Sequence, residues 1–499
     1  MESLREIADR ILPLLIYDPQ APMLFSSGLF LFLFAAFAFF YGFMRRTPTL
    51  RIWYVIAFSL YFYYKSSGIY LLLLVGVSIS DFWIGRAIAQ TASQRAKRGL
   101  VTLSIAADLA VLGYFKYTNF FIEIARNLFG AGFLEFQNIF LPVGISFFLF
   151  QSLSYTIDIY RGTLRPIDRW GDYLFYLSFF PQLVAGPIVR ARDFLVQIRQ
   201  NPITVSREMF GTGIFLIAIG LFKKAIISDY ISLNFVDRIF DDPALYSGVE
   251  CLAAVYGYAL QIYCDFSGYS DMAIGLALLL GFRFPKNFDA PYHSATITEF
   301  WRRWHISLSM WLRDYLYISL GGNRKGRLRT YFNLLVTMIL GGLWHGAAIR
   351  FVLWGTLHGV ALALHKIWLT VIPGAKVSGY EMHPLSRLAG ILVTFHLVCF
   401  GWLLFRADSM RTVQLMLHQI TDNFHLRLLP QMLTGYGGVF ALMGLGYLLH
   451  MLPDRADNAA RRAVIAAPFW AQVLLLGGVA WCVMQIQSSG IQPFIYFQF

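Results

Sequence analysis

The sequence predicts an all-α membrane protein that crosses the bilayer many times. Of its 499 residues, 57% are hydrophobic and 17% aromatic, but only 14% are charged; soluble domains have roughly 25% charged residues. The apolar residues form runs such as 24–44, 100–121 and 141–150, and most charged residues lie between such runs. Since a spanning helix needs about 20 mostly apolar residues, the chain has room for about ten to twelve spans and for no large soluble domain.

We expect one integrated membrane domain over residues 1–499, because no repeat of fixed period and no low-complexity linker divides it. Residues 1–20 have apolar side chains at helical spacing with charged residues around the rest of the wheel, which predicts an interfacial amphipathic helix. They lack the features of a removable signal peptide, so we expect them to be retained. Predicted spans and further apolar runs lie at 24–44, 52–64, 69–85, 100–121, 137–157, 172–189, 209–228, 250–264, 270–282, 330–349, 351–371, 388–405, 436–452 and 466–486.

The net charge of +13 does not indicate nucleic-acid binding, since no soluble basic domain carries it. In a membrane protein an excess of Lys and Arg first reports orientation. The four cysteines lie far apart in or beside apolar runs, form no CxxC pair, and are interpreted as core residues: Cys251, Cys264, Cys399 and Cys482.

The segment 283–329 is rich in basic residues, and its plainest interpretation is a solvated cytoplasmic loop. A threonine ahead of Glu299, either Thr296 or Thr298, is typical of a capping box and predicts a helix that continues to about residue 315. Aromatic residues and leucines would share one side of this helix, polar residues another, and His305 the border between them. The apolar side holds Trp301, Trp304, Leu308, Trp311, Leu312 and Tyr315, and the polar side holds Arg302, Ser309 and Arg313. The helix is too charged to span lipid alone, so we expect it in the interface or beside a wet cavity.

His345 is the strongest catalytic candidate on chemical grounds. It follows an apolar run and has glycines on both sides, Gly341 and Gly342 before it and Gly346 after it, which permit close approach of a helix or a substrate. Burial would keep its imidazole neutral, the form that a general base needs. The plainer interpretation is a hydrogen-bonded core histidine. His358 and His365 are interpreted as packing residues, and the histidine spacings match no helical metal site, so no metal is expected.

Asp265 and Asp271 interrupt apolar runs with carboxylates, which are costly at membrane depth unless paired or solvated. We interpret both as structural polar residues that pair with a basic group, for which an arginine of segment 283–329 is a candidate, or that cap a helix.

Four motifs resemble the membrane-bound O-acyltransferase (MBOAT) superfamily, specifically the bacterial branch of alginate, cellulose and peptidoglycan O-acetylation and teichoic-acid D-alanylation. In chain order they are GPIVR, DFSGYSDMAIG, TEFWRRWHISLSMWLRDYLYISLGGNR and GGLWHG. The resemblance covers residues 24–370, the expected MBOAT core, and leaves 371–499 as C-terminal transmembrane helices. It implies about 11 transmembrane helices, with interfacial and re-entrant helices, around a thinned centre.

The resemblance implies that His345 is the catalytic histidine and His305 the second functional histidine. Arg302, Arg303 and Arg313 are candidates for the phosphates of the donor. The candidate substrate-binding residues are Trp304, Ser309, Arg302, Arg313, Asp314, Asn333 and Trp344.

The expected function is transfer of an acyl group, with acetyl favoured, from a cytoplasmic thioester across the bacterial inner membrane to an extracellular polysaccharide or wall polymer. The donor would be acetyl coenzyme A or an acyl carrier protein, with no permanently bound cofactor. The resemblance implies a separate extracytoplasmic or periplasmic acetyltransferase as partner; membrane lipids surround the protein, and no nucleic acid is expected. Two alternatives stay open: a lipid acyltransferase, and a transporter or flippase without acyl chemistry.

Basic residues between the early spans predict the topology. The gaps 45–51, 86–98 and 161–169 are basic, whereas the gap 237–250 is acidic. The positive-inside rule then places the three basic gaps in the cytoplasm and the acidic gap outside. Single cysteines introduced into a cysteine-free chain should be labelled by an impermeant reagent at 237–250 only. Opposite labelling of any two basic gaps would contradict this topology.

Overall fold

The computed structural model describes residues 13–19, 22–372 and 382–486, so most of the predicted interfacial helix at 1–20 lies outside the described residues. Every regular element in the described ranges is helical, which confirms the predicted all-α class. Five of the described helices are long and apolar enough to cross a membrane, or up to six if one bent pair counts as a span. The figure of about 11 spans stays a prediction.

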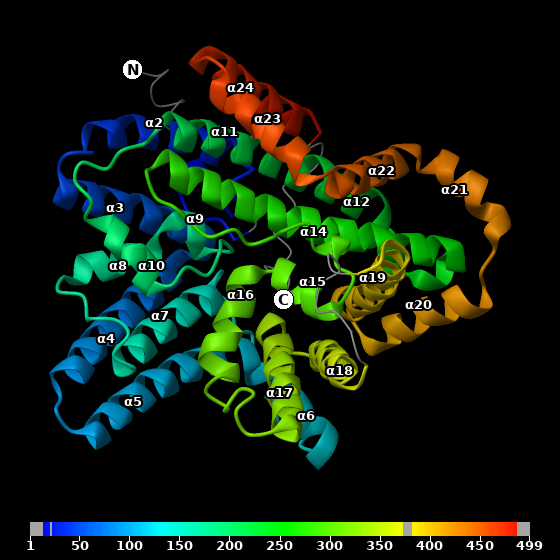
Figure 1. The fold of residues 1–499 in the computed structure, drawn as a ribbon, viewed down its shortest axis with the longest axis horizontal. Helices are drawn as coiled ribbons and strands as arrows, with labels where there is room; N and C mark the ends of the chain where they lie inside the picture. Colours follow the sequence, from blue (N-terminus) through cyan, green and yellow to red (C-terminus); the bar gives the residue numbers. More distant parts are fainter. Residues whose placement is uncertain (1–12, 20–21, 373–381, 487–499) are drawn as a thin grey trace. The chain divides into compact units, whose positions relative to one another are not determined.

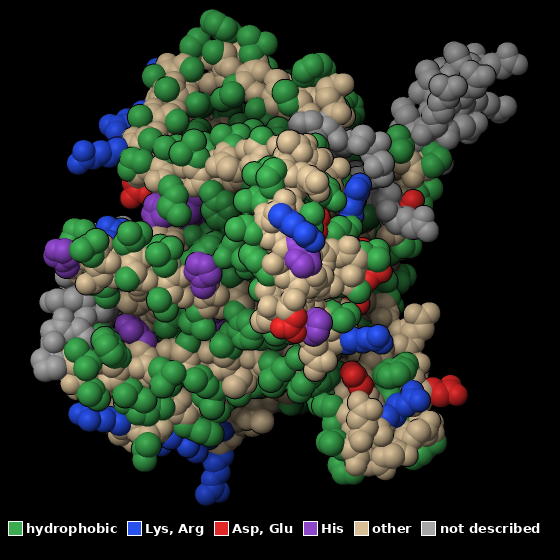
Figure 2. Space-filling view, turned by 90° about the vertical axis from the view of Figure 1, so that its right-hand side faces the viewer, with side chains coloured by type: hydrophobic (Ala, Val, Ile, Leu, Met, Phe, Trp, Pro, Cys, Tyr) green, Lys and Arg blue, Asp and Glu red, His purple; other side chains and the backbone are tan. Residues whose placement is uncertain are grey.

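Large apolar side chains lie on the outside of these helices. Phe32, Leu72 and Trp83 are each at least 60% exposed, and hydrophobic side chains spread over the face shown in Figure 2, on which charged side chains are few. Apolar surface of this extent marks a protein that interacts with membrane. The protein is therefore a multi-pass membrane protein.

The chain divides into two compact units. The first comprises the residues up to Gly213 and Met272–Phe284, and the second comprises Ile214–Asp271 and the described residues from Pro285 onwards. The single integrated domain expected from the sequence stays a prediction.

The first unit is built on helices that pack through apolar faces. Helices α4, α5 and α7 lie side by side (Figure 1) around a core that includes Tyr63, Leu74 and Phe148. The buried guanidinium of Arg51 donates hydrogen bonds to the carbonyls of Arg45, Ile198 and Gln200 at 2.8–3.0 Å. The helices are α2 Gly28–Phe43, α3 Pro48–Ser67, α4 Leu71–Gln90, α5 Gln94–Leu112, α6 Thr118–Phe129, α7 Ile145–Tyr160, α8 Trp170–Ser178, α9 Phe180–Leu183, α10 Ala191–Ile198 and the first part of α11 Arg207–Leu221.

The second unit contains the histidines and the basic segment singled out above. Between its α-helices lie three π-helical segments, Phe222–Ser228, Ser232–Val236 and Leu312–Tyr317. Its helices are α12 Asp229–Ile231, α13 Asp237–Asp241, most of α14 Gly248–Leu279, α15 Ile297–Arg303, α16 Ile306–Trp311, α17 Arg327–His345, α18 Ile349–Val371, α19 Pro384–Arg406, α20 Met410–Asp422, α21 Leu429–Gly435, α22 Gly437–Met451, α23 Asp454–Ala466 and α24 Phe469–Ile486.

Helix α14 is continuous through the polar stretch that the sequence suggests as a break between two runs. Lys224 Nζ lies 2.6 Å from Asp265 Oδ1 and 2.7 Å from Asp229 Oδ1, and Lys223 Nζ lies 2.7 Å from Asp271 Oδ2. Asp265 and Asp271 are thus paired with lysines of a π-helical segment, not with an arginine of 283–329 as suggested. Because the charges are neutralised in place, the helix can carry them without ending.

Glycines bring α17 and α18 into backbone contact. A Cβ atom added to Gly342 would lie 2.2 Å from the carbonyl oxygen of Phe351, and one added to Gly355 would lie 2.3 Å from that of Met338. Only glycine tolerates this distance between two helices. The close pair, seen near the bottom of Figure 1, fixes the position of His345 at the end of α17.

Replacement of Gly355 by alanine should therefore force α17 and α18 apart. We expect Gly355→Ala to destabilise the protein by about 1–3 kcal/mol, the usual cost of overpacking. Thermal unfolding of the purified protein in detergent would measure this as a lower midpoint. The control is Gly444→Ala in α22, where a Cβ atom meets nothing within 4 Å. Equal midpoints for the two variants would contradict the close contact.

Candidate functional site

The basic segment begins with the predicted capping box. Thr296 Oγ1 accepts a hydrogen bond from Glu299 N at 3.1 Å, and Glu299 Oε2 accepts one from Ala295 N at 3.1 Å. The Thr296 hydroxyl thus caps α15, and the Glu299 carboxylate reaches back to the N–H of the residue before the cap. The prediction of a capping box is confirmed, with Thr296 as the capping residue.

The single helix predicted to continue from there to about residue 315 is wrong. Helix α15 ends at Arg303 and α16 begins at Ile306, with His305 between them in the left-handed conformation at φ 42°. The reason is Asn287, which lies earlier in the chain. Its carbonyl oxygen accepts a hydrogen bond from Ile306 N at 2.9 Å, and its side-chain Oδ1 accepts one from Ser307 N at 3.2 Å. Asn287 thus binds N–H groups at the start of a new helix and breaks the old one.

His305 lies at this break and is fully buried. The ring of Phe266 meets it edge to face with centroids 4.6 Å apart, and the ring of Trp344 lies 6.1 Å away. Burial lowers the pKa of His305 to about 3. The imidazole is therefore neutral near pH 7, with one nitrogen that carries a proton and one that carries a lone pair.

His345 is the last residue of α17 and is 3% exposed. Its ring centroid lies 5.0 Å from that of Trp344, 5.1 Å from Trp354 and 5.3 Å from Phe405. The next residue, Gly346, has to be glycine, because a Cβ atom at this position would lie 1.9 Å from the ring of Phe351. The structure thus brings both candidate histidines to the same indole, that of Trp344.

Further aromatic rings extend this cluster and include the C-terminal helices. Trp304, 1% exposed, lies 4.8 Å from Trp402 of α19, whose indole N–H donates to the hydroxyl of Tyr292 at 3.1 Å. Phe405, against His345, also belongs to α19. Residues beyond 371 therefore contribute to the site, because side chains of α19 pack around the histidines.

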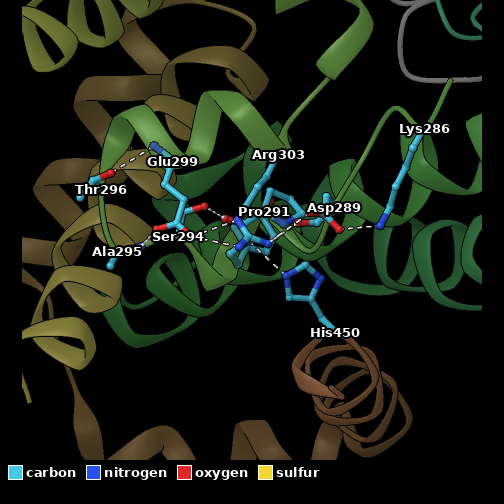
Figure 3. Close-up of polar contacts among 10 residues, drawn as sticks. Lys286, Asp289, Pro291, Ser294, Ala295, Thr296, Glu299, Arg303 and His450 are labelled. Carbon is cyan, nitrogen blue, oxygen red and sulfur yellow. Dashed lines mark hydrogen bonds and ion pairs between the residues drawn. The ribbon is translucent and has the colours of Figure 1, made fainter. Parts of the chain in front are cut away.

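Arg303 is held in a network of polar contacts (Figure 3). Its Nε donates to Glu299 Oε1 at 3.1 Å, and its Nη1 donates to the backbone oxygen of Asp289 at 3.0 Å. Burial acts to raise the pKa of Asp289, but the hydrogen bond from Lys286 and the nearby positive charges lower it overall. His450 of α22 joins this cluster by accepting a hydrogen bond from Tyr292 N at 3.2 Å. Arg303, only 9% exposed, therefore supports the site and does not face solvent.

The other predicted substrate-binding residues differ in exposure. Arg302 is exposed, and Arg313 is exposed and paired with Asp314 at 2.6 Å. Ser309 Oγ donates to the backbone oxygen of Trp304 at 3.3 Å. Asn333 is buried and donates to the carbonyl oxygens of Leu320 and Gly322 at 3.3 and 2.9 Å, so it closes the loop after Leu312–Tyr317.

Asn287 is the site residue that the sequence analysis missed. In the sequence, Asn287 is a single amide residue in the partly aromatic stretch Asn287–Tyr292. No pattern of helical spacing distinguishes it from its neighbours. In the described ranges, no group of three or more His, Cys, Asp or Glu side chains is arranged to hold a metal ion.

Comparison with known proteins identifies the family of the chain. The model of the membrane-bound O-acyltransferase (MBOAT) family matches residues 170–401. The probable alginate O-acetylase AlgI of Pseudomonas putida is 37% identical over 505 residues, which cover 96% of this chain and 100% of the relative. That of Pseudomonas aeruginosa is 42% identical over 394 residues, 78% of this chain and 73% of the relative. The peptidoglycan O-acetyltransferase of Helicobacter pylori is 35% identical over 420 residues, 78% of each chain. The chain therefore belongs to the membrane-bound O-acyltransferase family and is an acyltransferase.

Proposed function

We propose that the protein transfers an acetyl group from a thioester donor on the cytoplasmic side of the bacterial inner membrane to hydroxyl groups of an extracellular polysaccharide or wall polymer. The observation that carries this proposal is the pair of buried histidines, His305 and His345, against the indole of Trp344. The names of the relatives, which are alginate and peptidoglycan O-acetylating proteins, support the acetyl group and the polymer. Family membership favours this function over a transporter without acyl chemistry.

In the proposed reaction His345 is the general base. Its imidazole takes the proton of the attacking hydroxyl while the hydroxyl oxygen bonds to the carbonyl carbon of the thioester. The carbon–sulfur bond then breaks, the ester is formed, and the thiolate leaves and regains a proton from the imidazolium. The dry, aromatic surroundings strengthen any dipole directed at the developing oxyanion.

The donor side is proposed at the exposed arginines. Arg302 and Arg313 are exposed, with Arg313 paired to its neighbour Asp314, whereas Arg303 is largely buried and bound to Glu299 and Asp289. A basic surface at the entrance to the site would attract an anionic donor. Coenzyme A and the phosphopantetheine of a carrier protein both carry phosphate. The remaining candidates, Trp304, Ser309, Asp314, Asn333 and Trp344, would shape the path to the histidines.

On the outer side we propose a separate extracytoplasmic acetyltransferase as partner, which would present the acceptor polymer to this protein. Transfer across the membrane requires a route through the protein, and the site at the end of α17 would lie on it. The acyl donor is a substrate, and the proposal needs no permanently bound cofactor or metal.

The first test is the loss of the base. His345→Ala and the bulkier His345→Gln should leave folding intact and lower acetyl transfer by about 10²–10⁴-fold, the usual contribution of a general base. His305→Ala should lower it less if His305 only assists. Release of free thiol from acetyl coenzyme A in proteoliposomes would measure the rate.

The control for this test is His396→Ala, which removes an exposed histidine of α19 that touches Tyr256. A folded His345 variant that transfers acetyl at the wild-type rate would refute the proposed role. Transport of intact substrate without release of thiol would refute the proposed function itself.

The second test concerns the donor. Arg302→Gln and Arg313→Gln should raise the apparent KM for the thioester a few-fold, since an exposed charge pair contributes about 0.2–1 kcal/mol. The effect should shrink as salt is added, because salt screens exposed charges. Arg411→Gln, an exposed arginine of α20, is the matched control. If acceptor use fell while the KM for the donor stayed constant, the arginines would belong to the acceptor side.

A further inference from the structure

We infer that Asn287 is a positioning residue that fixes His305 in one tautomer, with the proton on Nδ1 and the lone pair on Nε2. This inference rests on the proposed function only in giving His305 a role in the reaction. Asn287 itself touches no reacting atom in this scheme. It is 1% exposed and lies 18 positions before the histidine in the chain.

The first step is the orientation of the Asn287 amide. A backbone N–H can only donate, and Ser307 N lies 3.2 Å from one amide atom of Asn287. That atom must therefore be the oxygen, Oδ1, and the other atom the NH₂ group. The NH₂ group then faces Ser270 Oγ at 3.1 Å, and Ser307 Oγ donates to Oδ1 at 2.9 Å. The backbone N–H of Ser307 fixes this orientation, and the two serine hydroxyls, which can donate or accept, are compatible with it.

The second step follows at the imidazole. Nδ1 of His305 lies 3.2 Å from the same oxygen of Asn287. An amide oxygen can only accept, so Nδ1 must carry a proton. Burial keeps the ring neutral, as the lowered pKa indicates, so the ring carries no second proton and Nε2 holds the lone pair.

This tautomer limits what the Nε2 atom of His305 can do in the reaction. A neutral ring with its proton on Nδ1 cannot donate a hydrogen bond from Nε2 to an oxyanion. It can accept one at Nε2, from the attacking hydroxyl or from an imidazolium formed at the base. Through Nε2, His305 can therefore act only as a hydrogen-bond acceptor in the reaction, and stabilisation of the oxyanion falls to another group, such as an indole N–H.

Asn287 also explains why the ring cannot turn to present the other nitrogen. His305 is held in the left-handed conformation at φ 42° between two helices, and Phe266 lies edge to face against its ring at 4.6 Å. The same amide oxygen binds both the ring and the first turn of α16. Backbone and imidazole are thus fixed by one side chain.

The direct test is ¹⁵N nuclear magnetic resonance of protein labelled at histidine and held in detergent micelles. The ¹⁵N shifts of Nδ1 and Nε2 report which nitrogen is protonated, and His305→Gln assigns the resonances by their disappearance. We expect a proton on Nδ1 of wild-type His305 between pH 6 and 8, as burial and the amide oxygen require. A proton on Nε2, or an equal mixture, would overturn the inference without any variant of Asn287.

Two substitutions then connect the tautomer to the rate. Asn287→Leu should remove the preference for Nδ1–H and lower acetyl transfer by roughly tenfold or more, since a wrong histidine tautomer alone costs several orders of magnitude elsewhere. Asn287→Asp keeps an acceptor oxygen, so it should retain Nδ1–H and, by its negative charge, raise the pH at which activity is lost on the acid side. Asn234→Leu is the matched control, because its amide only donates to Tyr230 O at 2.9 Å and lies outside the site.

The outcomes separate this inference from the proposed function. If Asn287→Leu left both the tautomer and the rate unchanged, Asn287 would have no positioning role. If it shifted the tautomer but left the rate unchanged, the inference about the rate would fail although the geometry held. If the His305 and His345 variants stayed active while the wild-type tautomer was found as expected, the proposed roles of the two histidines in the reaction would fail and the tautomer would stand.

Discussion

The hydrogen bonds that Asn287 makes to the backbone of Ile306 and Ser307 determine the geometry of this site. Without these hydrogen bonds, the local sequence from Thr296 onwards would favour one amphipathic helix. On that helix His305 would lie at the border between the polar and the apolar face. With them the chain turns at His305, and the imidazole enters the aromatic interior beside Phe266. The cost is a residue in the left-handed conformation, which an L-residue adopts only when its surroundings hold it there.

The sequence predicted those features that depend on near neighbours. Helical class, the positions of most helices and the capping box of Thr296 and Glu299 all arise from spacings of a few residues, and His345 stands out because glycines flank it. The break at His305 was not predictable in this way, because its cause lies 18 positions away. The continuity of α14 was missed for the same reason, since its carboxylates are neutralised by lysines from another segment.

The arginines of the basic segment fall into two groups, buried and exposed. Neighbouring arginines have opposite environments: Arg302 is exposed, whereas Arg303 is bound to the carboxylates of Glu299 and Asp289. A buried guanidinium needs such partners, because an unpaired buried charge costs several kcal/mol. From composition alone, both arginines are candidates to bind the phosphate groups of the donor. Only the fold distinguishes the arginine that supports α15 from the arginine that can meet a donor.

Rigidity around the histidines arises from backbone contact as well as from rings. Helices α17 and α18 touch through Gly342 and Gly355, so His345 sits at the end of a helix that has little room to shift. A general base must be held within a fraction of an ångström of its proton to be effective. Gly342, which the sequence analysis expects to permit close approach of a helix, does so in the structure, and the two helices in contact hold the imidazole of His345 in place.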